Sequence, residues 1–257
     1  MAISINVKKL SKKSIIIFSA LAALLIIITI IAVSAVGKRP VQSDFFDTNA
    51  DYVSGIDVSQ HNGEIEWNKV SNAADFAMIR VGYRGYGNGA LQEDSRYEEN
   101  LKNAEKEDIP IGVYFYSQAI TPEEADEEAE YVLELIKPYD IDLPVFIDFE
   151  YPYDAEGKHT GRMFNADLSG RDTAEIINAF CRKIITAGYR AGVYSSSNVY
   201  NFDIKTSALD KDIFIWVADY NSKVTYLGRY DIWQYTKNGS CDGVSSKYVD
   251  LNKWYIK

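Results

Sequence analysis

Two carboxylates separated by a single residue are the feature of this sequence with the most direct chemistry. The apolar segment LPVFIDFE at residues 143–150 ends in Asp148 and Glu150. Side chains two residues apart on a strand point to the same face, so both carboxylates are expected in one cleft. They cannot both ionise easily in a partly dry site, and one should keep its proton near neutral pH. Such a pair is what glycoside hydrolysis requires.

Further acids follow other apolar segments of the chain. Asp57 and Asp219 end two such segments, and Asp250 lies in the last segment, YVDLN. In parallel α/β folds, functional residues gather at the carboxyl ends of the strands, so we expect these acids near Asp148 and Glu150. The alternative interpretation is structural: the acids cap loops or form ion pairs with arginines such as Arg80 or Arg84.

Aromatic residues are frequent beside these same segment ends. The chain contains 19 tyrosines and 4 tryptophans. An aromatic ring can stack on the apolar face of a sugar and still present a polar tip, although many of these rings are expected to serve in core packing. The substrate-binding set predicted from the sequence is Tyr83, Tyr114, Tyr116, Trp216, Asp219 and Gln234.

The elements that position these residues alternate between strands and helices. The predicted strands are the apolar segments 53–59, 76–82, 111–117, 143–150, 190–196, 213–219 and 230–235. They are nearly continuously apolar, as strands covered on both faces are. Helices are predicted at 94–107, behind a capping box at 121–124, and from a cap at Asp172 to Gly188. This order predicts a parallel α/β barrel, with a doubly wound open sheet as the alternative.

Composition excludes several classes of function. The net charge is −10, and residues 1–39 hold six basic residues and no acid, so the remainder is strongly acidic and a poor nucleic-acid binder. Cys181 and Cys241 cannot form a four-cysteine zinc site, although they could pair with each other. The glycines at 82–89 match no nucleotide-binding loop. We therefore expect no cofactor and no structural metal.

The amino-terminal segment is typical of a membrane anchor. Residues 14–37 contain no charged residue and are long enough to cross a bilayer. More basic residues precede this segment than follow it, which predicts residues 1–13 in the cytoplasm and the rest outside. A cleaved signal peptide, giving a secreted protein, is the alternative. Residues 38–52 are interpreted as a polar linker and residues 53–257 as one catalytic domain.

Several segments, in order, resemble the glycoside hydrolase family 25 lysozymes, the Chalaropsis-type N-acetylmuramidases. The opening GIDVSQHNGEIEW (55–67), the stretch from Arg80 to Tyr116, PVFIDFE (144–150) and the closing 232–252 are each similar to family segments. One departure is YFYSQ at 114–118, where many relatives carry histidine. The resemblance implies a single distorted (β/α) barrel.

The resemblance also implies a reaction and a set of roles. The expected substrate is the peptidoglycan glycan strand, cut by a monomeric domain at the β-1,4 bond from N-acetylmuramic acid to N-acetylglucosamine. Glu150 corresponds to the general acid/base, and Asp148 to the group that assists the substrate's acetamido group. Asp57 and Asp250 line the same cleft.

Two other functions remain open at this stage. One is a catalytically inactive wall-binding protein on the same barrel, although the acid set is intact. The other is a metal-dependent polysaccharide deacetylase, which would need an Asp-His-His set. His61 and His159 do not supply that set convincingly, and His61 is expected in a loop at the rim of the cleft.

Overall fold

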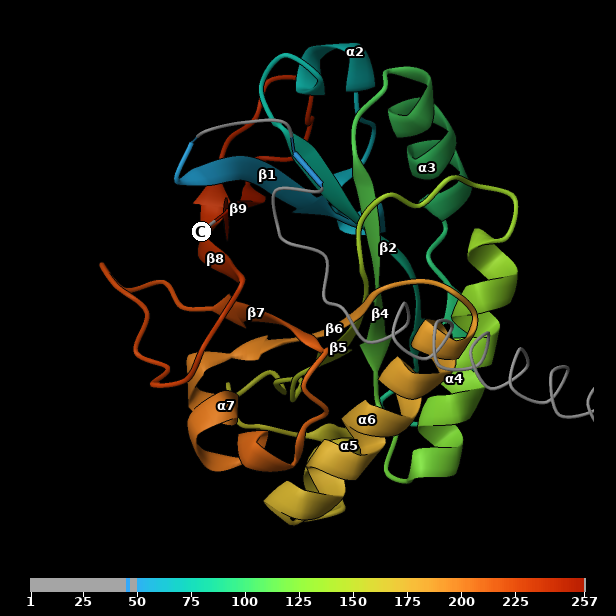
Figure 1. The fold of residues 1–257 in the computed structure, drawn as a ribbon, viewed down its shortest axis with the longest axis vertical. Helices are drawn as coiled ribbons and strands as arrows, with labels where there is room; N and C mark the ends of the chain where they lie inside the picture. Colours follow the sequence, from blue (N-terminus) through green and yellow to red (C-terminus); the bar gives the residue numbers. More distant parts are fainter. Residues whose placement is uncertain (1–44, 47–49, 257) are drawn as a thin grey trace, which may run out of the picture. The chain divides into compact units, whose positions relative to one another are not determined.

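The computed structural model describes residues 45–46 and 50–256. Within these residues, eight strands form a closed barrel (Figure 1). In their order around the barrel they are β1 (Tyr52–Val58), β9 (Val249–Tyr255), β8 (Ile232–Gly239), β7 (Phe214–Ala218), β6 (Ala191–Ser196), β5 (Val145–Phe149), β4 (Ile111–Ser117) and β2 (Phe76–Arg84). The short β3 (Leu91–Glu93) pairs with β2 outside this ring. The pairing of β1 with β2 closes the barrel and excludes the open sheet.

The barrel is not wholly parallel, which corrects the sequence-based expectation. Six neighbouring pairs are parallel: β1–β2, β2–β4, β4–β5, β5–β6, β6–β7 and β7–β8. Strand β9 runs antiparallel to both of its neighbours, β8 and β1. A parallel neighbour needs a crossover of a dozen or more residues. Only residues 240–248 separate β8 from β9, so the chain must turn back on itself.

All three predicted helices are present, as α3 (Tyr97–Lys106), α4 (Pro122–Ile136) and α6 (Gly170–Thr186). The described residues also form three short helices and two 3₁₀ turns that the sequence did not predict: α2 (Trp67–Val70), α5 (Gly161–Asn165), α7 (Ser197–Phe202), η2 (Gln60–Asn62) and η3 (Thr206–Ala208). Thr121 caps α4 as expected. The N-cap of α6 is Ser169, not Asp172, because Ser169 Oγ accepts from the Asp172 N–H and Asp172 completes the capping box.

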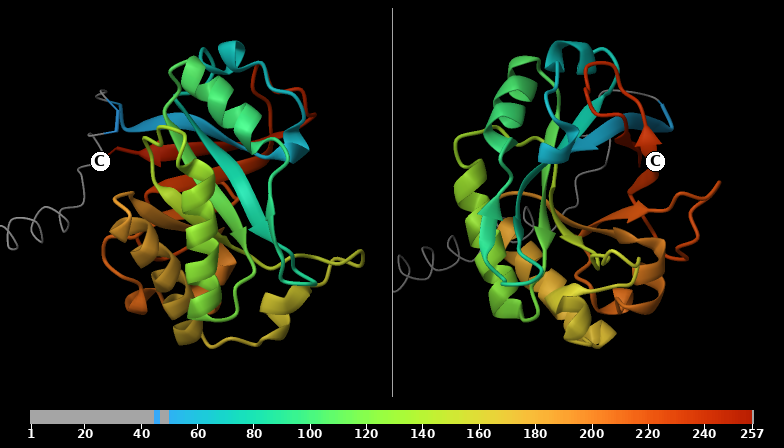
Figure 2. Two further views of the ribbon diagram at one scale, coloured as in Figure 1. Left: turned by 90° about the vertical axis from the view of Figure 1, so that its right-hand side faces the viewer. Right: turned by 180° about the vertical axis from the view of Figure 1, so that it is seen from behind.

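Helices α3, α4 and α6 cover one side of the barrel. α4 and α6 pack against each other, α3 contacts β2 and β4, and α6 contacts β5 and β6 (Figure 2). Apolar side chains between this layer and the strands form the larger core, which includes Val132, Ile177 and Phe180. Cys181 is buried on α6, and both it and Cys241 are free thiols, so the disulfide left open by the sequence is not formed.

A second apolar cluster fills the barrel interior and includes residues that the sequence placed in a linker. Phe46 is buried, with its ring 5.5 Å from that of Trp254 and 5.9 Å from that of Phe76. Phe45 packs on Trp254 and Phe214. These two residues of the predicted polar linker therefore belong to the packed domain, because their rings cover apolar strand residues.

The predicted membrane anchor at residues 14–37 lies outside the described residues, as does most of the predicted linker. Within the described part of the chain, no helix combines the length and the apolar character needed to cross a membrane.

The barrel interior beneath the strand ends is tightly packed at Gly192, and this generates a stability prediction. A Cβ at Gly192 would overlap the ring of Phe146 on the neighbouring strand. We expect Gly192→Ala to lower the free energy of unfolding by about 1–3 kcal/mol, the usual cost of overpacking. Urea denaturation measures this. Gly87→Ala is the matched control, because no atom lies within 4 Å of its added Cβ. Equal stability of the two variants would contradict the packing described.

Candidate active site

The carboxyl ends of the strands surround a cleft of about 540 Å³. The structure brings together all four acids that the sequence singled out for this place. Asp57 comes from β1, Asp148 from β5, Glu150 from the residue after β5, and Asp250 from β9, and all four line the cleft. These four acids therefore converge as expected, whereas Asp219, which was expected with them, does not line the cleft.

Strand register explains how distant residues meet. Asp57 lies opposite Asp250 in the antiparallel β1–β9 pair. Asp148 is aligned with Tyr116 on β4 and with Tyr194 on β6. Aligned residues on neighbouring strands share a face, so these side chains form one polar layer above the apolar interior.

Two amide side chains hold Asp57 from below. Its Oδ2 accepts hydrogen bonds from Gln234 Nε2 at 2.9 Å and from Asn252 Nδ2 at 2.8 Å. Asn252 Oδ1 in turn accepts from Trp216 Nε1 at 2.9 Å. Asp57, Gln234 and Asn252 are all buried, so this part of the network forms the floor of the site.

The oxygen of the Gln234 amide is also engaged. Gln234 Oε1 accepts from the hydroxyls of Tyr194, at 3.0 Å, and Tyr220, at 2.7 Å. Because its oxygen and one amide N–H are used inside the protein, the residue is well placed to orient Asp57.

The acids differ from ordinary carboxyls because they are withdrawn from water and close to one another. The pKa of Glu150 is raised to about 7, first by burial and second by the charge of Asp250, against the opposing effects of Lys237 and Arg80. Burial raises the pKa of Asp250 to about 6, against the opposing effects of Asp57 and Lys237. The expectation of an acid that is protonated near neutral pH is therefore met by Glu150.

Asp148 and Asp57 are the most deeply placed of the four acids. Burial raises the pKa of Asp148 well above its usual range, and the charge of Glu150 adds to the effect. Burial likewise raises the pKa of Asp57, together with the charge of Asp250. The cleft therefore retains protons that the same groups would lose in water.

The nearby arginines do not form ion pairs with the strand-end acids. Arg80 pairs with Asp94 at 2.8 Å, and Arg84 pairs with Glu128 at 2.7 Å. The interpretation of Asp148 and Glu150 as partners of these arginines is therefore not what the structure shows. Arg80 still lines the cleft and lowers the pKa of Asp148 and Glu150 through its charge.

Besides Gln234, which lines the cleft, the predicted substrate-binding residues divide into three groups. Tyr83, Tyr114 and Tyr116 line the cleft and are partly exposed. Trp216 also lines it but is only 1% exposed, with its ring 4.7 Å from that of Tyr194, so it offers little area for a sugar. Asp219 is not among the lining residues.

Asp219 instead organises the loop that follows β7. Its Oδ2 accepts from the backbone N–H of Thr225 at 2.7 Å, and its Oδ1 accepts from that of Asn221 at 3.1 Å. Burial acts to raise the pKa of Asp219, but these hydrogen bonds outweigh it and hold the pKa below its usual range. Its carboxylate is thus committed to its own loop.

Three further residues matter for the geometry of the site and were not predicted from the sequence as part of it. Asn252 lies two residues after Asp250 on β9, and the two-residue period of a strand could have identified it. Tyr194 could have been found by the same alternation within 190–196. Arg80 could not, because the register of β2 against β4 shifts between Arg80 and Gly82, which breaks the alternation.

The two histidines occupy separate places. His61 lies in η2 and lines the cleft, as expected for a residue at its rim. His159 packs against the rings of Tyr151, Tyr153 and Phe164. The described residues contain no group of three or more His, Cys, Asp or Glu side chains arranged to hold a metal ion.

Comparison with known proteins decides the family. Residues 56–244 match the family model described as glycosyl hydrolases family 25. The chain belongs to this family. As a family 25 glycoside hydrolase, it carries its four clustered acids on the barrel that related structures share.

Among solved structures, the chain is similar to the modular autolysin LytC from Streptococcus pneumoniae, which was solved with a synthetic peptidoglycan ligand. The TM-score is 0.66 at 28% identity, covering 79% of this chain and 47% of LytC, so this chain spans about half the length of that protein. The lysozyme from Streptomyces coelicolor shares the fold with a TM-score of 0.61 at 24% identity, covering 80% of this chain and 93% of that one.

A curated relative carries no assigned role. It is the uncharacterized protein YegX of Escherichia coli O157:H7, which is 24% identical over 231 residues, covering 84% of this chain and 75% of that protein.

The raised pKa of Glu150 generates a prediction about stability. Between its ordinary pKa of 4.5 and about 7, the folded protein holds a proton that the unfolded chain has lost. The free energy of unfolding must therefore fall as pH rises through this window. Glu150→Gln removes the ionisable group, so we expect it to be more stable than the parent at pH 8, by about 1 kcal/mol or more. The difference should shrink towards pH 4.

Thermal or urea unfolding at several pH values measures this difference. Glu134→Gln is the control, since Glu134 is an exposed residue of α4 and its replacement should change stability little at either pH. A Glu150→Gln variant that is no more stable than the parent at pH 8 would contradict the described environment of the acid.

Proposed function

We propose that this family 25 glycoside hydrolase is an N-acetylmuramidase, which cleaves the β-1,4 bond between N-acetylmuramic acid and N-acetylglucosamine in peptidoglycan. The observation that carries the proposal is the Glu150 carboxyl, which is withdrawn from water and raised in pKa to about 7 within a cleft of acids. The peptidoglycan ligand of the similar autolysin LytC supports this choice of substrate.

In the proposed reaction, Glu150 protonates the oxygen of the leaving sugar. A glycosidic oxygen is a poor leaving group without a proton, and general acid assistance contributes about 10²–10⁴-fold to the rate. An acid with a pKa near 7 is still protonated in much of the enzyme at neutral pH. Glu150 can therefore act as acid in the first step and as base in the second.

Asp148 does not suit the role of a direct nucleophile. It lies on β5 two residues before Glu150 and so approaches the sugar from a similar side, whereas a nucleophile and an acid normally stand on opposite sides of the bond. We infer substrate assistance, in which the 2-acetamido oxygen attacks the anomeric carbon and Asp148 accepts a hydrogen bond from the acetamido N–H. That hydrogen bond favours the ionised form of Asp148.

Asp57 and Asp250 act on the other two acids in this proposal. Asp250 raises the pKa of Glu150 by its charge, and Asp57 shares a hydrogen bond with Asp250. Because Gln234 and Asn252 fix Asp57, the position of the whole acid cluster is tied to β8 and β9.

We also propose that the enzyme acts outside the cytoplasm, where its substrate lies. The support is the uncharged segment 14–37 with its excess of preceding lysines. The same pattern supports attachment to the membrane through residues 14–37.

Digestion of purified peptidoglycan by the full chain tests the proposed bond. We expect products that give muramitol ends after borohydride reduction. Glucosaminitol ends would instead indicate a glucosaminidase, and release of acetate without new reducing ends would indicate a deacetylase. Under substrate assistance, glycan that lacks the muramic acetyl group should resist cleavage, and early products should be β-anomers because two inversions retain configuration.

Glu150→Gln in the same digestion connects the product to the residue. It should reduce turnover at least about 10²-fold with the fold intact, because it keeps the shape of the side chain and removes the proton. Glu134→Gln should retain turnover. A parent enzyme that binds glycan without turnover would instead fit an inactive wall-binding protein.

A further inference from the structure

The main chain that carries Glu150 is held from both sides by side chains of neighbouring strands. β5 ends at Phe149, and the last residue pairs of its ladders involve Asp148 and Phe149, so the ladder does not fix Glu150 itself. The Ser195 hydroxyl on β6 donates to the carbonyl of Phe149 at 2.6 Å. Gln118 Nε2, from the residue after β4, donates to the carbonyl of Glu150 at 3.2 Å.

Both donors are themselves fully buried. Gln118 and Ser195 are each 0% exposed. The Ser195–Phe149 bond is buried and the Gln118–Glu150 bond is partly buried, and a buried donor that loses its partner is costly. The two bonds therefore constrain consecutive carbonyls at the point where the chain leaves the strand and presents the Glu150 carboxyl to the cleft.

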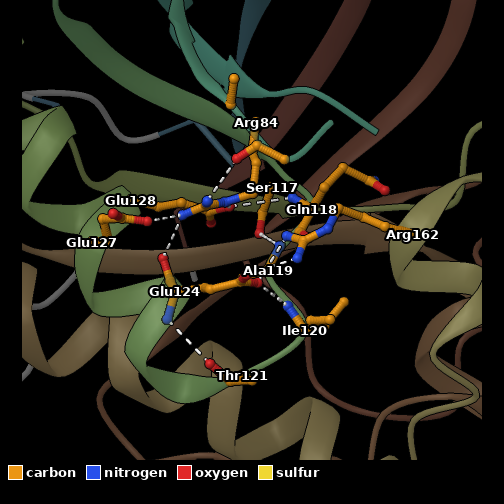
Figure 3. Close-up of polar contacts among 12 residues, drawn as sticks. Arg84, Ser117, Gln118, Ala119, Ile120, Thr121, Glu124, Glu127, Glu128 and Arg162 are labelled. Carbon is orange, nitrogen blue, oxygen red and sulfur yellow. Dashed lines mark hydrogen bonds and ion pairs between the residues drawn. The ribbon is translucent and has the colours of Figure 1, made fainter. Parts of the chain in front are cut away.

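The backbone N–H and the backbone carbonyl of Gln118 are both hydrogen-bonded to other side chains. Its N–H donates to Glu128 Oε1 at 3.3 Å, and its carbonyl accepts from Arg162 Nη1 at 3.0 Å. Figure 3 shows Gln118 between these two partners, one on α4 and the other on α5. A residue held in this way can transmit the position of the helices to the Glu150 backbone.

The partners of Gln118 belong to two ion pairs. Glu128 accepts from Arg84 Nε at 2.7 Å, and the side chains of this pair are 0% and 5% exposed. Arg162 donates to both carboxylate oxygens of Glu124, at 2.8 and 2.7 Å (Figure 3). The bidentate geometry fixes direction as well as distance. Removal of one member of the buried Arg84–Glu128 pair would be costly, because it would leave the other charge buried without a partner.

We propose that Gln118 and Ser195 are positioning residues for Glu150, holding the main chain at the end of β5 so that its carboxyl stays oriented and shielded from water. The inference rests on the proposed role of Glu150 as general acid. The Arg84–Glu128 and Arg162–Glu124 pairs act one step further out, by holding Gln118.

Loss of the hydrogen bond from Gln118 or Ser195 should lower the pKa of Glu150. The charged and titratable groups that face Glu150 are Asp148, Asp250, Lys237, Arg80, Tyr116, Tyr194 and Tyr220. None of them is removed by a change at Gln118. A freed main chain lets water reach the Glu150 carboxyl, and its pKa then falls from about 7 towards the ordinary value. The acid step needs the protonated form, so activity should be lost at a lower pH.

The test is the pH dependence of kcat and KM for Gln118→Met in the full chain. Methionine keeps the length of the side chain and removes the donor to the Glu150 carbonyl. We expect kcat to fall about tenfold, as for a small misplacement of a catalytic group, with KM changed less than about twofold. The basic limb of the kcat profile should move to lower pH by about half a unit or more. Ser195→Ala should shift the basic limb of the kcat profile in the same direction, and it is the variant to test if Gln118→Met does not fold.

Asn178→Leu is the matched control. Asn178 on α6 is also a buried amide, 1% exposed, and its Nδ2 donates to the carbonyl of Ala208 at 2.9 Å, outside the cleft. It should lower the melting temperature without moving the pH limb. An equal shift in this control, or an unchanged kcat and limb in folded Gln118→Met and Ser195→Ala, would overturn the positioning role. Full turnover by Glu150→Gln would contradict the proposed function instead, so the two failures are distinguishable.

Discussion

The cost of keeping four carboxyl groups away from water at one end of a barrel governs the rest of this structure. Asp57, Asp148, Glu150 and Asp250 line one cleft, and burial raises the pKa of each. Such a cluster cannot carry four full charges, so it retains protons into the neutral range. The fold supplies amide donors at Asp57 and positive charges at Arg80 and Lys237, which limit the cost without removing it.

The irregular part of the barrel makes this crowding possible. A ninth strand running antiparallel between β8 and β1 places Asp250 directly opposite Asp57. On the other side of the cleft, parallel strands place Asp148 between Tyr116 and Tyr194. Glu150 lies beyond the last ladder pairs, where orientation depends on side-chain hydrogen bonds. The family 25 barrel thus combines a rigid floor with a reactive group at a strand end.

Sequence reasoning predicted the parts of this arrangement that depend on local patterns. Two-residue periodicity was enough to place Asp148 and Glu150 on one face, and apolar segments located most of the strands. Strand β9 was not among the predicted strands, because Asp250, Asn252 and Lys253 interrupt its apolar residues. The packing of Phe46 on Trp254 and the hydrogen bond from Gln118 to Glu150 were missed because they join residues far apart in sequence. The pairing of Arg80 with Asp94 was missed because it depends on the pairing of β2 with β3, a strand that the sequence did not predict.

The pKa of Glu150 is the quantity on which the account depends most, and carboxyl ¹³C NMR of glutamate-labelled protein measures it directly. The Glu150 resonance is assigned by its loss in Glu150→Gln, and Asp250→Asn supplies the comparison. The account predicts titration near pH 7 in the parent and at lower pH in Asp250→Asn, because Asp250 raises the pKa by its charge. Titration near the ordinary value of 4.5, unchanged by Asp250→Asn, would contradict it.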